Sequence, residues 1–168
     1  MNIVNYTGGV SQLTNFKIVQ GDLLELARNK EFDIIVHGCN CFNTMGSGIA
    51  KQIGDRFPQA RQVDYATEYG DYNKLGNYTS WTSDAGLTIV NAYTQYTYSR
   101  NSDVFEYTSF KMILQKLAHN FPEKKSFGFP LIGMGLAGGD KNRIFDLIDE
   151  FAYNVSTNSI VTVVEYSK

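Results

Sequence analysis

Short apolar runs alternate along the chain with stretches in which apolar residues recur every three or four positions. The short runs predict buried strands at residues 16–19, 32–36, 77–81, 87–93, 127–132 and 160–164. Helical spacing predicts helices at residues 23–27, 49–57, about 60–69 and 107–119, and a last helix that carries Ile144, Leu147, Ile148 and Phe151. We therefore expect a three-layer α/β/α sandwich with a central mixed sheet of about six strands.

The order of the expected elements predicts where a ligand binds. Residues 83–86, Ser-Asp-Ala-Gly, separate two strands and favour an antiparallel hairpin. Most other strands are followed by a helix, and sheets built in this way bind ligands beyond the carboxyl ends of their strands. We expect the site at that edge, provided that the strand order brings the relevant strands together.

Two glycine-rich loops follow expected strands. Residues 37–48 read His-Gly-Cys-Asn-Cys-Phe-Asn-Thr-Met-Gly-Ser-Gly, and residues 133–140 read Gly-Met-Gly-Leu-Ala-Gly-Gly-Asp. Glycine allows a ligand to approach the backbone closely, and the unpaired N–H groups at the start of a helix bind anions. The pattern predicts a phosphate-bearing ligand between the loops, with His37, Asn40 and Asn43 at the mouth of the cleft.

Composition narrows the class of protein. The 168 residues are 43% hydrophobic, which suits one domain over residues 1–168. The formal net charge is −2 and the basic residues are scattered, so general nucleic-acid binding is not expected. The chain has no apolar run of membrane-spanning length and no signal-like start, so we expect no membrane association. Cys39 and Cys41 are the only cysteines, which fits a reducing compartment such as the cytoplasm, or the host cytoplasm for a viral protein.

The two loops together resemble a known family. Residues 36–41, Val-His-Gly-Cys-Asn-Cys, and 45–50, Met-Gly-Ser-Gly-Ile-Ala, combine with residues 129–139 in the order found in macrodomains. The resemblance is strongest to the ADP-ribose 1″-phosphate phosphatase branch with its phage and yeast-type members, which is related to the terminal ADP-ribose glycohydrolases. It extends from residue 21 to the last strand.

The resemblance implies a role for several positions. Asp22 would accept a hydrogen bond from the adenine amino group, with the Leu23 backbone completing adenine recognition. Asn40 would hold the distal ribose, and His37 matches a histidine implicated in catalysis. The catalytic residues implied are thus His37 and Asn40. The substrate-binding residues implied are Asp22, Leu23, Gly38, Asn40, Gly46, Ser47, Gly48, Ile49, Ile132, Gly133, Met134, Gly135, Leu136, Ala137, Gly138, Gly139 and Asp140.

The sequence also departs from the neighbouring glycohydrolase branch. Members of that branch use a lysine on the strand that ends here in Asn91-Ala92-Tyr93, and an aspartate at the position of Ala137. Asp140 would replace that aspartate only if the loop folds back. These differences argue against removal of ADP-ribose from protein by the lysine route and leave hydrolysis of a phosphate monoester open.

His37 and the cysteines each have a simpler interpretation. A histidine at a strand end is often a structural residue, whereas the motif favours a role in attacking the terminal phosphorus or in handling a proton. Cys39 and Cys41 point to the same side of a strand, and small buried apolar residues are the favoured interpretation over a metal site. No metal and no cofactor are expected.

Three functions therefore compete. The leading one is a phosphatase that converts ADP-ribose 1″-phosphate to ADP-ribose and inorganic phosphate. The second is a non-catalytic ADP-ribose-binding module, in which His37 is a packed wall residue. The third is a hydrolase acting on ADP-ribosyl esters or nucleotide adducts, for which Asn40 and Asp140 would matter more than His37. The expected partners are ADP-ribose and its 1″-phosphate.

Overall fold

A computed structural model describes residues 2–4, 15–98, 103–135 and 137–167. The strands are β1 (Asn2–Val4), β2 (Phe16–Gly21), β3 (Ile34–Cys39), β4 (Tyr78–Thr82), β5 (Thr88–Tyr93), β6 (Ser126–Phe129) and β7 (Ile160–Tyr166). The helices are α1 (Leu23–Arg28), α2 (Gly48–Arg56), α3 (Pro58–Tyr65), α4 (Tyr107–Asn120) and α5 (Lys141–Asn154), with a 3₁₀ turn η1 (Tyr72–Lys74). Within the described residues no helix has the length and apolar character needed to cross a membrane.

The strands form a single mixed sheet in the order β1-β2-β7-β6-β3-β5-β4. Pairing is parallel from β2 to β5, and the two edge strands, β1 and β4, are antiparallel to their neighbours. The carboxyl ends of β3, β5 and β6 therefore lie together at one edge of the sheet, as the expected position of the site requires. The expected hairpin is confirmed as β4 and β5.

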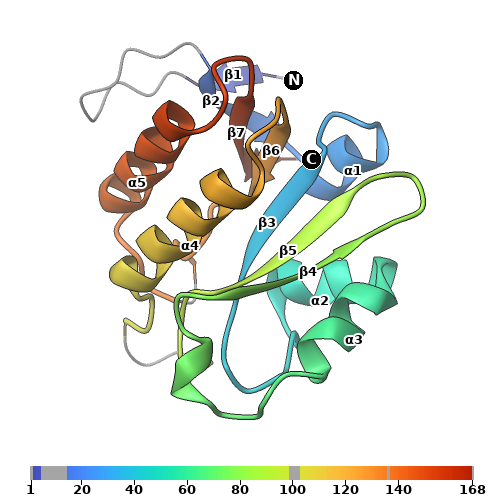
Figure 1. Cartoon of the computed structure of the whole chain (residues 1–168), viewed down its shortest axis with the longest axis vertical. Helices are drawn as coiled ribbons and strands as arrows, with labels where there is room; N and C mark the ends of the chain where they lie inside the picture. Colours follow the sequence, from blue (N-terminus) through green and yellow to red (C-terminus); the bar gives the residue numbers. More distant parts are fainter. Residues whose placement is uncertain (1, 5–14, 99–102, 136, 168) are drawn as a thin grey trace.

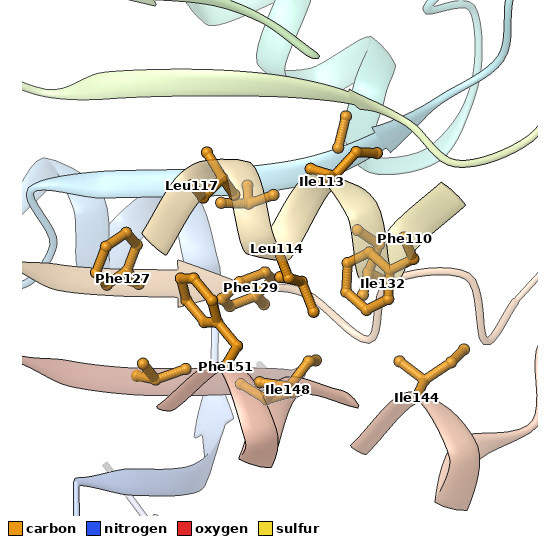
Figure 2. Close-up of a cluster of buried hydrophobic side chains, with 14 of the residues drawn as sticks. Phe110, Ile113, Leu114, Leu117, Phe127, Phe129, Ile132, Ile144, Ile148 and Phe151 are labelled. Carbon is orange, nitrogen blue, oxygen red and sulfur yellow. The ribbon is translucent and has the colours of Figure 1, made fainter. Parts of the chain in front are cut away.

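Helices cover both faces of the sheet (Figure 1). On one face, α4 and α5 pack their apolar sides against β6 and its neighbours, where Phe110, Leu117, Phe127 and Phe151 are among the buried side chains (Figure 2). On the other face, α1, α2 and α3 cover a second cluster that includes Ile53 and Ile89. Burial of one large apolar side chain contributes about 1.5–3 kcal/mol, so these clusters hold the three layers together. The α/β class and the three layers are confirmed.

Three details differ from the sequence prediction. The sheet gains a seventh strand, β1, which pairs with β2 over three residues. The strand expected over residues 127–132 ends at Phe129, because Pro130 lacks an N–H group and the chain turns there. The helix expected over about residues 60–69 covers Pro58–Tyr65, with Pro58 in its first turn.

Candidate functional site

A cavity of about 700 Å³ lies at the carboxyl ends of β3, β5 and β6. Both glycine-rich loops contribute to its wall, so the structure brings them together around one space. The lining residues are Gly38, Cys39, Asn40, Thr44, Met45, Gly46, Ser47, Gly48, Ile49, Ala50, Asp64, Gln95, Tyr98, Pro130, Leu131, Ile132, Gly133, Gly135 and Ala137. The volume falls in the range of sites that enclose a nucleotide-sized molecule.

The amino-terminal end of α2 opens into this cavity. Gly48 begins the helix with a φ of 56°, a left-handed conformation that favours glycine. The Ser47 side chain does not cap the helix, and the N–H groups of Gly48, Ile49 and Ala50 have no acceptor among the described residues. Three free donors at the positive end of a nine-residue helix are suited to binding an anion.

The glycines of the second loop differ in their surroundings. Gly133 has a φ of 73°, and a Cβ there would collide with the Phe105 ring. A Cβ on Gly139 would lie 2.6 Å from the Gly133 carbonyl oxygen, which accepts a hydrogen bond from the Gly139 N–H group. Gly135, in contrast, lines the cavity and has no atom within 4 Å of its Cβ position. Gly133 and Gly139 therefore shape the loop, and Gly135 leaves room inside the cavity.

A buried lysine holds the first loop in place. The Lys74 ammonium, on η1, donates to the carbonyl oxygens of Cys41 and Glu68, each at 3.0 Å, and to Asn43 Oδ1. Asn43 adopts a φ of 55° and also donates to the Thr67 carbonyl oxygen at 2.8 Å. These bonds fix the turn that follows β3 and so fix the position of the loop relative to the cavity.

The Asn40 side chain lies at the start of this loop. Its Oδ1 accepts from the Phe42 N–H group at 2.8 Å, and its Nδ2 donates to Thr44 Oγ1, also at 2.8 Å. Asn40 thus closes a local turn and lines the cavity at the same time. Each atom still has one further hydrogen-bonding position that a ligand could use.

Comparisons with known proteins agree on the fold. The chain is 33% identical over 141 residues to an uncharacterized 17.5 kDa protein of phage T4, which covers 81% of this chain and 89% of the phage protein. It matches a macrodomain protein from Streptomyces coelicolor with a TM-score of 0.69 at 24% identity, over 91% of this chain and 99% of that one. The chain has the macrodomain fold and belongs to the family of the T4 protein.

Two further relatives match this macrodomain. DarTG of Thermosipho africanus, solved in complex with ADP-ribose, gives a TM-score of 0.72 at 17% identity over 93% of this chain and 43% of that one. The ADP-ribose 1″-phosphate phosphatase of Saccharomyces cerevisiae is 35% identical over 66 residues, which is 38% of this chain and 36% of the yeast enzyme. No family model matches the sequence.

Ten of the residues implied by the resemblance line the cavity of the macrodomain. They are Gly38, Asn40, Gly46, Ser47, Gly48, Ile49, Ile132, Gly133, Gly135 and Ala137. Met134, Gly138 and Gly139 belong to the second loop but do not line the cavity, and Leu136 lies outside the described residues.

The two aspartates implied by the resemblance begin helices outside the cavity lining. Asp22 caps α1, and its Oδ1 accepts from the N–H groups of Leu24 and Glu25 at 3.0 and 3.2 Å. Asp140 caps α5 by accepting from the Arg143 N–H group at 3.0 Å. The loop does not fold back to bring Asp140 into the cavity, so Asp140 does not replace the aspartate missing at Ala137. Leu23, next to Asp22, is buried in the core.

His37 does not reach the cavity. Its side chain is fully buried on β3, and Nε2 lies 2.7 Å from Asn91 Oδ1 on β5. Asn91 donates its amide to the Ala60 carbonyl oxygen at 3.0 Å and to Thr79 Oγ1 at 3.2 Å, so its Oδ1 is an acceptor and His37 Nε2 carries the hydrogen. Burial lowers the pKa of His37 to about 4, which keeps the ring neutral at pH 7. The buried, neutral ring does not fit the expected attack on a phosphorus atom in the cavity.

Asp64 is the principal residue that the sequence analysis missed. It lies on α3, is 1% exposed, and is the one acidic side chain among the described residues that line the cavity. Tyr93 donates its hydroxyl hydrogen to Asp64 Oδ1 at 2.8 Å, while Asp64 Oδ2 has no partner among the described residues. The available signal was its spacing: Asp64 falls four residues after Ala60, on the buried face of the helix.

The two cysteines have the environment expected of small apolar residues. Both are buried and free, and both belong to the cluster beneath α1, α2 and α3. Burial raises the pKa of the Cys39 thiol well above its ordinary value and that of Cys41 to about 11. Cys39 lines the cavity as a neutral thiol, which makes it a poor nucleophile.

Proposed function

We propose that this macrodomain binds ADP-ribose 1″-phosphate in the cavity and hydrolyses its terminal phosphate, giving ADP-ribose and inorganic phosphate. The observation that carries the proposal is the pair of glycine-rich loops lining one cavity of about 700 Å³, one of them with three unpaired N–H groups at a helix start. A nucleotide sugar with several phosphates matches these donors and the open glycine position of the second loop. The yeast relative is named for this reaction, and the DarTG structure contains ADP-ribose.

The two loops would divide the ligand between them. The second loop, with its open position at Gly135, would receive the diphosphate. The first loop and the start of α2 would surround the distal ribose and the terminal phosphate, with Asn40 in reach of ribose hydroxyls. The adenine would extend toward Asp22, whose Oδ2 accepts no hydrogen bond from the described residues.

Charge stabilisation is the catalytic contribution that this backbone would make. Hydrolysis of a phosphate monoester places negative charge on the three non-bridging oxygens, and fixed N–H donors lower the barrier by stabilising that charge. The N–H groups of Gly48, Ile49 and Ala50 are held by the helix and need no rearrangement to do so.

A non-catalytic binding module is the second candidate. It is favoured by the position of His37, because the side chain expected to act on the phosphate is buried and outside the cavity lining. In that case the same loops would recognise ADP-ribose without turning over any derivative.

One experiment separates the two candidates. The purified full chain is given ADP-ribose 1″-phosphate, and phosphate and ADP-ribose are quantified separately, while calorimetry measures the binding of ADP-ribose. The phosphatase proposal predicts equimolar release of both products. Binding of ADP-ribose with no release of phosphate would identify a binding module, and absence of binding would contradict both candidates.

A further inference from the structure

The buried carboxyl group of Asp64 is the feature that the proposed backbone chemistry leaves without a role. One of its oxygens is fixed by Tyr93, and the other has no hydrogen-bond partner among the described residues although it is shielded from solvent. An unpartnered buried carboxyl oxygen costs free energy of folding. Asp64 is among the residues that line the cavity, so its carboxyl group lies beside the space that a ligand would occupy.

A chain of hydrogen bonds sets the orientation of this carboxyl group. It runs from His37 to Asn91 at 2.7 Å, from Asn91 to Thr79 at 3.2 Å, and from Thr79 to the Tyr93 hydroxyl at 3.0 Å. Tyr93 then donates to Asp64 at 2.8 Å. The chain joins β3, β5, β4 and α3, so the sheet and the helical layer on one of its faces both contribute to the position of one side chain.

We propose that Asp64 is the general acid of the phosphatase reaction, an inference that rests on the proposed function. The oxygen of a water molecule forms a bond to the terminal phosphorus, and the bond from phosphorus to the anomeric oxygen of the distal ribose breaks. The electron pair of that bond stays on the ribose oxygen, which takes the proton of the Asp64 carboxyl. The proton lost by the water restores the acid. The products are ADP-ribose and inorganic phosphate, with no other reactant.

The surroundings of Asp64 favour its protonated form. Burial raises the pKa of the carboxyl, while the hydrogen bond from Tyr93 and the Lys74 ammonium act in the opposite direction. The other titratable neighbours among the described residues are the Cys39 and Cys41 thiols, whose raised pKa values keep them neutral. A phosphate brought into the cavity adds negative charge and raises the pKa of Asp64 further, because like charges disfavour ionisation. A leaving sugar hydroxyl is a weak acid, so proton donation is the step where this chain can contribute most.

The test compares Asp64→Asn with the parent chain. Asparagine keeps the shape and the oxygen that accepts from Tyr93 but has no proton to donate in this way. We expect kcat for phosphate release to fall by about 100-fold or more. ADP-ribose affinity should stay within about threefold, since general acid catalysis acts in the transition state. Asp84→Asn, which changes an exposed carboxyl in the β4–β5 turn, is the matched control and should retain parent activity.

Tyr93→Phe gives an independent readout through pH. The parent kcat should fall on the alkaline side as Asp64 loses its proton. Removing the Tyr93 hydroxyl takes away a hydrogen bond that favours the ionised carboxyl, so this alkaline limb should move to higher pH. The free substrate phosphate titrates identically in assays of every variant, so it contributes equally to all of the pH profiles. A purely structural role for Asp64 would leave the limb where it is.

The outcomes are distinct. Parent-like turnover by Asp64→Asn, or an unmoved alkaline limb in Tyr93→Phe, overturns the role of Asp64 and leaves the phosphatase proposal intact. A parent chain that binds ADP-ribose but releases no phosphate overturns both the phosphatase proposal and the role of Asp64 as general acid. Loss of turnover with retained binding, together with the shifted limb, supports the inference.

Discussion

Gly135 offers a way to alter the cavity without altering the fold. Its Cβ position has no neighbour within 4 Å, and its φ is not in the left-handed region. We expect Gly135→Ala to leave the free energy of unfolding within about 0.5 kcal/mol of the parent value. The added methyl group occupies space that the diphosphate needs, so the affinity for ADP-ribose should fall by about tenfold or more, corresponding to about 1.4 kcal/mol. Calorimetric titration and urea denaturation measure the two quantities.

The matched variant is Gly133→Ala in the same loop. Gly133 has a φ of 73° and its Cβ position is occupied by the Phe105 ring, so this change should destabilise the fold by about 2 kcal/mol or more. If Gly135→Ala bound ADP-ribose as tightly as the parent, the second loop would not be the diphosphate site.

Individual site residues differed in how far the sequence could predict them. Gly46 and Gly48 were predictable because they lie at the start of a helix after a buried strand, a local signal with a known use. The burial of His37 was not predictable, because its partner Asn91 is 54 positions away and only the register of β3 with β5 brings the two together. Asp64 was missed for a similar reason. The residues around it in the sequence do not distinguish it from an ordinary surface carboxylate, and only the packing of α3 places it at the cavity.

At the scale of elements, η1 supports the first loop through a single ammonium group. Lys74 is 8% exposed. Two of its acceptors, on Cys41 and Asn43, precede α2, and the third, on Glu68, follows α3. We expect Lys74→Met to lower the free energy of unfolding by about 2–3 kcal/mol, because buried acceptors lose a charged donor. The turn at residues 41–43 should loosen as well. Amide hydrogen exchange at residues 41–43 should therefore accelerate in Lys74→Met, and it should accelerate more there than in β6, which pairs with β3.

Lys124→Met is the control for the loss of a positive charge. Lys124 is exposed in the connection between α4 and β6, so its replacement should change stability by less than about 0.5 kcal/mol. Equal protection of the turn in Lys74→Met and Lys124→Met would show that the ammonium does not hold the loop.

Helices and strands could be predicted where residues nearby in the sequence determine them. They were harder to predict where pairing with a distant strand determines them. Pro58 was expected to end one helix, and it also begins the next, because a proline in the first turn of a helix needs no N–H partner. β1 was not predicted, since three residues carry too little periodicity and their strand identity comes from pairing with β2. The meeting of the two glycine loops depended on strand order, which places β6 beside β3 although their carboxyl ends, Phe129 and Cys39, are 90 positions apart in the sequence.

At the scale of the whole molecule, the burial of His37 links stability to pH. The folded-state pKa of about 4 lies below the ordinary value of 6.5, so the unfolded chain binds more protons than the folded chain between these two pH values. Stability from this group is therefore fully present above about pH 6.5, declines as pH falls, and is lost below about pH 4. A shift of this size corresponds to about 3 kcal/mol.

Urea denaturation between pH 7 and pH 4.5 measures this decline, and His37→Gln isolates it. The glutamine can still donate to Asn91 but does not titrate, whereas His119 and the carboxylates are common to both proteins. The variant should start less stable at pH 7 because its packing is altered, and it should lose less stability on acidification than the parent. Protonation would add a hydrogen to Nδ1 and leave the Nε2 hydrogen bond to Asn91 in place, so the loss of stability comes from the buried, desolvated charge on the ring. Parallel pH profiles for the two proteins would mean that the imidazole titrates alike in the folded and unfolded chain, and that its burial does not control the acid stability of the sheet.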